Sequence, residues 1–131
     1  MIGRFRGTTH RMDESYKVLI VDDEEIVRRS LERLLVTFGH TVSHAASVAE
    51  ALAMLEGHDV AVVDMLLPDG LGTEIVAAIR ARGWPIRVAL MTGRTSLELA
   101  ERADAVFFKP FDMTAMVKWI GERPGGGGEP A

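Results

Sequence analysis

Residues 60–64, VAVVD, are the part of this sequence that most limits its fold. Four consecutive apolar residues leave no polar position, so neither face of such a strand can lie against water. A strand buried on both faces belongs in a sheet that is covered on both sides. In chains where strands alternate with helices, that sheet is parallel.

The surrounding sequence supplies the alternation. Apolar residues at helical spacing between Val27 and Phe38 predict a helix that Gly39 closes, and Ser47 with Glu50 matches a capping box that opens another. Residues 66–72, LLPDGLG, are expected to form a loop. The predicted strands are 17–21, 41–46, 60–64, 86–91 and 105–108, and the other predicted helices are 73–82, 96–102 and 113–122. Right-handed crossovers then favour a doubly wound α/β sheet.

The composition fits one domain of ordinary globular character. The chain has 131 residues and no cysteine, which excludes thiolate chemistry. Its net charge of −4 gives no support for nucleic-acid binding through a general positive field. No apolar stretch approaches the roughly 18 residues of a membrane span, and no signal peptide is recognisable, so a cytoplasmic location is expected. Residues 16–122 are predicted to be the folded domain, between a disordered extension (1–15) and a flexible Gly/Pro-rich tail (123–131).

Polar side chains stand where four of the five strands end. Asp22 and Asp23 follow the first strand, Asp64 ends the third, Thr92 follows the fourth and Lys109 follows the fifth. In a doubly wound sheet the binding crevice lies at the carboxyl ends of the strands. Oxygen ligands without His or Cys favour Mg²⁺, or alternatively Mn²⁺, over zinc.

Each of these signals has a simpler interpretation when taken alone. Asp22 and Asp23 would serve equally well as helix-capping acids, Asp64 as a turn residue and Lys109 as a solvated cation. Their joint occurrence at four strand ends favours a phosphoryl-transfer site in which Asp64 is the nucleophile.

The motifs VLIVDDEE, VAVVDMLLPDGLG, LMTG and FFKPF, in this order and spacing, resemble the receiver domain of two-component response regulators. The resemblance covers about residues 16–121. It implies a single flavodoxin-like domain with the strand order 2-1-3-4-5. It also implies a stand-alone phosphorelay protein, similar to the chemotaxis regulator, that is not a separate enzyme and acts as a monomer or weak dimer.

The resemblance assigns roles to the strand-end residues. Asp64 would accept a phosphoryl group from a sensor histidine kinase or a phosphotransfer protein. Asp23, Asp64 and the backbone carbonyl of Leu66 would bind Mg²⁺ directly, and Asp22 would bind it through a water molecule.

Three further assignments follow from the same resemblance. Thr92 would move towards the phosphoryl group, Lys109 would pair with it, and the Lys109–Pro110 bond would be cis. Signalling would then proceed by conformational change and protein contact with a downstream protein, without direct contact to nucleic acid or membrane.

Two departures from the family pattern concern the way in which phosphorylation would be transmitted to a downstream protein. The position three residues before the lysine usually holds Tyr or Phe, whose ring rotates as the threonine moves, and here it holds Val106. The helix expected at 96–102 is about one turn shorter than in other receivers.

Two alternatives remain open. A receiver-like scaffold could act without phosphorylation, which Val106 mildly favours. An aspartyl-phosphate hydrolase is less favoured, because such enzymes place a second aspartate two residues after the nucleophile, where this chain has Leu66. The histidines, His44 included, form no ligand cluster, and Arg28, Arg29 and Arg33 are interpreted as a solvated helix face that could also dock a kinase.

Overall fold

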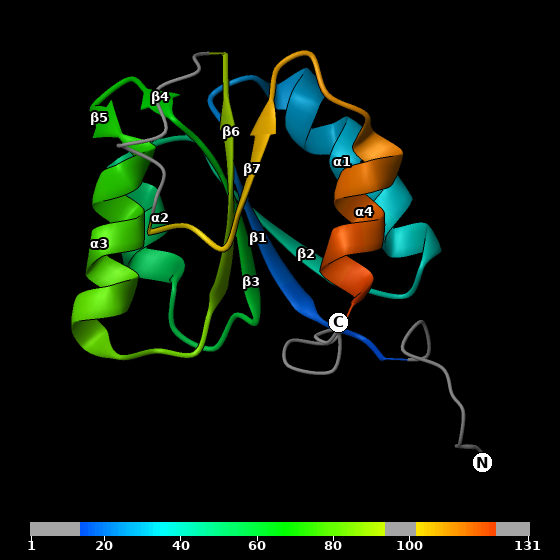
Figure 1. Cartoon of the computed structure of the whole chain (residues 1–131), viewed down its shortest axis with the longest axis horizontal. Helices are drawn as coiled ribbons and strands as arrows, with labels where there is room; N and C mark the ends of the chain where they lie inside the picture. The colour runs from blue at the N-terminus through cyan, green and yellow to red at the C-terminus, as the bar shows by residue number, and fades with distance from the viewer. Residues whose placement is uncertain (1–13, 94–101, 123–131) are drawn as a thin grey trace.

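The computed structural model describes residues 14–93 and 102–122, which form a parallel sheet between two layers of helices (Figure 1). The five strands of this sheet lie in the order β2-β1-β3-β6-β7, which is the predicted order 2-1-3-4-5. Their bounds are Lys17–Val21 (β1), Thr41–Ala45 (β2), Val60–Asp64 (β3), Arg87–Thr92 (β6) and Ala105–Phe108 (β7). The predicted doubly wound α/β fold is confirmed.

The helices cover the two faces of the sheet in pairs. On one face lie α2 (Val48–Met54) and α3 (Gly72–Arg82), and on the other lie α1 (Glu25–Thr37) and α4 (Met113–Gly121) (Figure 1). Within the described residues, no helix is long and apolar enough to cross a membrane.

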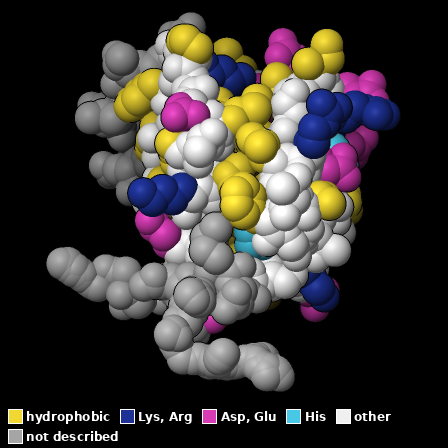
Figure 2. Space-filling model, turned by 90° about the vertical axis from the view of Figure 1, so that its right-hand side faces the viewer, with side chains coloured by type: hydrophobic (Ala, Val, Ile, Leu, Met, Phe, Trp, Pro, Cys, Tyr) yellow, Lys and Arg dark blue, Asp and Glu magenta, His cyan; other side chains and the backbone are white. Residues whose placement is uncertain are grey.

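Each face of the sheet has its own hydrophobic core. The β1 side chains alternate, so that Leu19 and Val21 pack towards α2 and α3, whereas Val18 and Ile20 pack towards α1 and α4. All four are fully buried, as are Val60 to Val63 of the central strand. Figure 2 shows the α1–α4 side, where apolar side chains gather along the middle of the face. Burial on both faces is the reason that β1 and β3 carry continuous apolar runs.

The helix-capping signals hold with one difference. Ser47 accepts a hydrogen bond from the Glu50 N–H, as a capping box requires. The Glu50 carboxylate accepts from the Ala46 N–H instead of that of Ser47, so the reciprocal bond falls one residue earlier. Gly39 has a positive φ of 94°, a conformation that suits glycine after a helix.

The segment after β3 differs from the predicted loop. It forms a small antiparallel hairpin of β4 (Leu66–Leu67) and β5 (Gly70–Leu71), joined by Pro68 and Asp69. Strands of two residues are too short to show alternation in a sequence. The Asp69 carboxylate accepts from the N–H groups of Val48 and Ala49, and thereby fastens the hairpin to the start of α2.

Other boundaries shift by one residue: β6 begins at Arg87 and includes Thr92, and α3 begins at Gly72. Ser15, which the sequence places in the N-terminal extension, donates to the carbonyl of Gly39. The short helix expected at 96–102 lies almost wholly outside the described residues, as does the Gly/Pro-rich tail.

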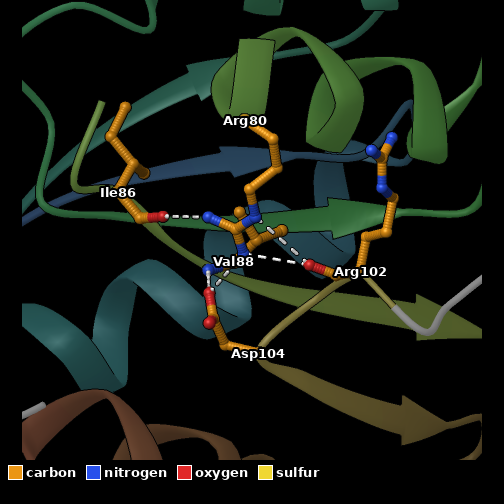
Figure 3. Close-up of polar contacts among 5 residues, drawn as sticks. All are labelled: Arg80, Ile86, Val88, Arg102 and Asp104. Carbon is orange, nitrogen blue, oxygen red and sulfur yellow. Dashed lines mark hydrogen bonds and ion pairs between the residues drawn. The ribbon is translucent and has the colours of Figure 1, made fainter. Parts of the chain in front are cut away.

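A network of hydrogen bonds joins elements at the amino end of the sheet (Figure 3). Arg80 of α3 donates to the carbonyls of Ile86 and Arg102 and to Asp104 Oδ2 at 2.9 Å. Asp104 Oδ2 also accepts from the Val88 N–H at 2.7 Å, and the Asp104 N–H donates to the Val88 carbonyl. The residues that precede β7 are therefore hydrogen-bonded to both β6 and α3.

Candidate functional site

The register of the sheet brings the strand-end aspartates together. Val21 of β1 lies opposite Val63 of β3, so Asp22 and Asp64 follow at the same level. Carboxylate oxygens of Asp22, Asp23 and Asp64 all lie within 4.8 Å of one another. Asp22 and Asp64 are buried, whereas Asp23 is exposed. The three acids predicted from the sequence thus form one cluster at the carboxyl end of the sheet, which we call the acidic rim.

Asp22 is the least solvated member of the acidic rim. Its Oδ1 accepts a hydrogen bond from the Glu24 N–H at 2.8 Å. Its Oδ2 is buried without a hydrogen-bond partner among the described residues. Burial raises the pKa of Asp22 from 3.8 to about 6, and the neighbouring charge of Asp64 adds to this rise, while the bond from Glu24 opposes it. The Asp22 carboxylate is therefore short of favourable contacts.

Lys109 places one positive charge against the acidic rim. Its Nζ lies 3.1 Å from Asp64 Oδ2 and 3.9 Å from Asp22 Oδ2. The Lys109 N–H donates to the carbonyl of Thr92, which continues the pairing of β7 with β6. Backbone pairing therefore determines where the ammonium group lies, and the lysine predicted from the sequence reaches two of the three acids.

Thr92 and Val106 lie on the neighbouring strands. Thr92 is the last residue of β6 and is buried at the carboxyl end of the sheet. Val106 is partly buried and packs against the core on the α2–α3 side, whereas Phe107 points to the other face and contacts the rings of Phe111 and Trp119. The position at which the resemblance implies a rotating aromatic ring is thus occupied by a short, partly buried side chain.

Two other predicted features lie beside the acidic rim. The Lys109–Pro110 peptide bond is cis. The Leu66 N–H lies 3.4 Å from Asp64 Oδ1, and the Leu66 side chain is exposed. Leu66 thus follows Asp64 closely enough for its backbone to border the site, and the place where a hydrolase would carry its second acid holds a solvent-facing leucine.

Gly72 is a site residue that the sequence analysis missed. A Cβ at this position would overlap the backbone carbonyl of Asp64 and lie 2.8 Å from Val63 Cγ1. The Gly72 N–H donates to the Met65 carbonyl at 2.7 Å. Only glycine lets the start of α3 approach the end of β3 so closely. The LLPDGLG motif contains this signal, but its two glycines cannot be told apart without coordinates.

The charge and donor set of this site fit a hard divalent cation. Three ionised carboxylates and one ammonium leave two negative charges in excess, and Asp22 Oδ2, which accepts no hydrogen bond from any described residue, lies among them. Mg²⁺ in proteins is bound through a few carboxylate oxygens and retains several waters. Asp22, Asp23 and Asp64 are therefore the residues that could hold such an ion.

The fold and the acidic rim define a class of signalling domain. The chain belongs to the response regulator receiver domain family of two-component systems, whose family model matches residues 18–120.

Curated relatives agree with this assignment. The chain is 33% identical over 120 residues to the acid tolerance regulatory protein ActR of Rhizobium meliloti, covering 86% of this chain and 62% of ActR. It is 43% identical over 86 residues to the DNA-binding transcriptional activator DevR/DosR of Mycobacterium tuberculosis, covering 63% of this chain and 40% of that protein. The chain thus spans about two-fifths to three-fifths of the length of these relatives.

Solved structures show the same architecture. A CheY-like receiver domain protein from Methanospirillum hungatei is 31% identical, with a TM-score of 0.73 over 82% of this chain and 91% of that one. The chemotaxis response regulator CheY4 of Vibrio cholerae is 29% identical, with a TM-score of 0.72 over 82% and 97% of the two chains.

Proposed function

We propose that this receiver domain accepts a phosphoryl group on Asp64 in a Mg²⁺-dependent reaction with the phosphohistidine of a sensor kinase or phosphotransfer protein. The observation that carries the proposal is the contact of Lys109 Nζ with Asp64 Oδ2 at 3.1 Å, beside two further carboxylates. A carboxylate that is held by an ammonium group and adjoins a cation site suits phosphoryl transfer, where positioning and charge neutralisation supply most of the catalysis.

In the transfer, a carboxylate oxygen of Asp64 forms a bond to phosphorus as the N–P bond of the phosphohistidine breaks. The electron pair of the N–P bond stays on the imidazole nitrogen, which takes up a proton. The ammonium group of Lys109 would pair with the transferred phosphoryl oxygens in place of the Asp64 carboxylate. The hydroxyl of Thr92, the last residue of the strand next to β3, would donate a hydrogen bond to one of these oxygens. A Mg²⁺ ion bound by the acidic rim would supply further positive charge.

Asp22, Asp23 and Asp64 would hold this cation, together with the backbone carbonyl of Leu66. Binding would relieve the deficit at Asp22, because its buried Oδ2 is without a hydrogen-bond partner among the described residues. We propose that the chain carries one phosphoryl group at a time on Asp64 and acts as a switch, and not as a separate enzyme. Its partners would be the kinase upstream and a protein target downstream.

Intact mass spectrometry after incubation with Mg²⁺ and acetyl phosphate tests the proposal. We expect one phosphoryl adduct on the wild-type protein, none after chelation with EDTA, and none on the Asp64→Asn variant. Asn has nearly the same shape as Asp, so the loss reports the nucleophile and not a disturbed fold. Absence of the adduct under conditions that label another receiver would refute the proposal and favour a scaffold role, for which Val106 is the supporting observation.

A further inference from the structure

Arg28 does not belong to the solvated face of α1 that the sequence suggested. It is half-buried, whereas its neighbours Arg29 and Arg33 are exposed. Its Nη1 donates to the backbone carbonyl of Asp22 at 2.6 Å. Its Nε donates to Nδ1 of His44 at 3.2 Å, on the adjacent strand β2. The guanidinium group therefore bridges α1, β2 and the end of β1.

A second contact orients the histidine that receives Arg28. Nε2 of His44 lies 2.9 Å from Glu32 Oε1, one turn further along α1. The contacts run in sequence from Glu32 through His44 and Arg28 to the Asp22 carbonyl. Because a planar guanidinium group donates in fixed directions, holding its Nε on His44 also aims its Nη1 at Asp22.

The backbone of Asp22 is consequently fixed on both sides. Its N–H donates to the carbonyl of Ala45, and its own carbonyl accepts from Arg28. Its carboxylate accepts from the Glu24 N–H and thereby closes the loop around Asp23. Two of the three acidic rim residues lie on this segment, so its conformation decides whether their oxygens converge.

We propose that Arg28 is a positioning residue for cation binding: it holds the Asp22–Asp23 segment in the geometry that the acidic rim needs. Arg28 touches neither the phosphoryl group nor the cation in this scheme. The inference rests on the proposed function for its purpose, although the contacts themselves do not. Groups that orient metal ligands through such contacts typically change metal affinity by about 10- to 100-fold when they are removed.

Charge and geometry predict opposite results for this residue. Removing a positive charge beside a cation site should tighten cation binding by simple Coulomb attraction. Removing the bond to the Asp22 carbonyl should weaken it, because the ligands lose their arrangement. Arg29 is the matched control, since it lies one residue away on the same helix, carries the same charge and pairs with Glu25 at the surface.

The test is a Mn²⁺ titration of the whole chain, followed by the electron paramagnetic resonance signal of the free ion and by competition with Mg²⁺. We expect Arg28→Ala to weaken binding by about tenfold and Arg29→Ala to leave it unchanged or slightly tighter. Arg28→Lys keeps the charge but cannot bridge His44 and Asp22 as a fork, so it should stay weak. Binding by Arg28→Ala that equals or exceeds that of the wild type would overturn the inference.

A metal-free readout separates this inference from the proposed function. In the absence of cations, the Glu24 amide should exchange with solvent faster in Arg28→Ala than in the wild type, at an unchanged melting temperature. Exchange at the wild-type rate in both Arg28 variants would overturn the positioning role. If the wild-type chain binds neither Mn²⁺ nor Mg²⁺, the proposed function fails, and the amide measurement still decides whether Arg28 orders the segment.

Discussion

The two ends of the parallel sheet differ in how fully their charged side chains are paired or hydrogen-bonded. At the carboxyl end, three carboxylates cluster beside one ammonium group that contacts two of them, and a buried oxygen of Asp22 lacks a hydrogen-bond partner within the described residues. At the amino end, Arg80 and Arg87 direct their guanidinium groups at backbone carbonyls, and Asp104 accepts two hydrogen bonds on one oxygen.

This difference suggests separate roles for the two ends: the carboxyl end carries the candidate functional site, and the amino end stabilises the fold. Unmet charge at the acidic rim is expected to reduce the stability of the metal-free protein, and under the proposed function it would also favour cation binding. The hydrogen-bonded charges at the amino end are expected to contribute to stability. Substitutions at the two ends should therefore change unfolding and cation binding in different combinations.

The largest change in stability is expected from Asp104→Ala. The substitution leaves the part-buried Val88 N–H without its acceptor, and an unsatisfied buried donor costs about 1–3 kcal/mol. Arg80 loses a partly exposed ion pair but keeps the carbonyls of Ile86 and Arg102 as acceptors. We expect the free energy of unfolding in urea to fall by about 1–3 kcal/mol, with Mn²⁺ affinity within a factor of about two of the wild type. The exposed Glu56→Ala is the control. A large loss of cation affinity in Asp104→Ala would show that the two ends are coupled.

Asp22→Asn should act in the opposite direction. Burial raises the pKa of Asp22 to about 6 in the folded protein, so at pH 7 the carboxyl is ionised and its burial costs free energy on folding. At pH 7 without metal, we expect the variant to be more stable than the wild type by about 2 kcal/mol, and to bind Mg²⁺ more weakly. The gain should shrink as the pH falls from 7 towards 4, since the wild-type carboxyl then takes up its proton. A variant that unfolds more easily than the wild type at pH 7 would contradict this explanation.

The smallest effect on stability is expected from His40 at the amino end. Its protonation should destabilise the fold as the pH falls, whereas protonation of Asp22 should relieve a destabilisation. Burial lowers the pKa of His40, and the positive charge of Arg87 lowers it further. Its Nδ1 accepts from the Tyr16 N–H, which requires the neutral ring. The stability that His40 contributes is present above pH 6.5 and is lost as the pH falls through its lowered pKa.

His40→Asn keeps an acceptor near the Nδ1 position and removes this titration. Urea unfolding between pH 7.5 and 5.5 should show a stability that declines more steeply with acid for the His40 protein than for the variant. Both proteins should carry Asp22→Asn, which removes the opposing titration at the acidic rim. Parallel curves would mean that protonation of His40 costs the fold nothing.

The sequence predicted the parts of this molecule that depend on pattern. An apolar run such as VAVVD can lie only in the middle of a covered sheet, and its bounds agree with β3. Acids that end adjacent parallel strands must meet at one edge, so the cluster of Asp22, Asp23 and Asp64 followed from the strand assignment.

The parts that the sequence did not reveal depend on contacts between specific atoms. Helical periodicity placed Arg28 on an outer face, but it carries no information about a guanidinium group that folds back onto the Asp22 carbonyl. The hairpin at Leu66–Leu71 was missed because its strands are two residues long. The requirement for glycine at position 72 becomes visible only when α3 is placed against β3.

The pairing of β7 with β6 has a consequence for folding. Thr92 lies opposite Phe108, and Lys109 reaches Asp64 from the next position. Since side chains alternate across a strand, a slip of one residue would turn the lysine to the opposite face and leave the three acids without their counter-charge. If Asp64 is the phosphoacceptor, as proposed, the fraction of molecules that take up a phosphoryl group would equal the fraction in which β7 is paired in the correct register. The mass-spectrometric assay would then also report how accurately the chain folds.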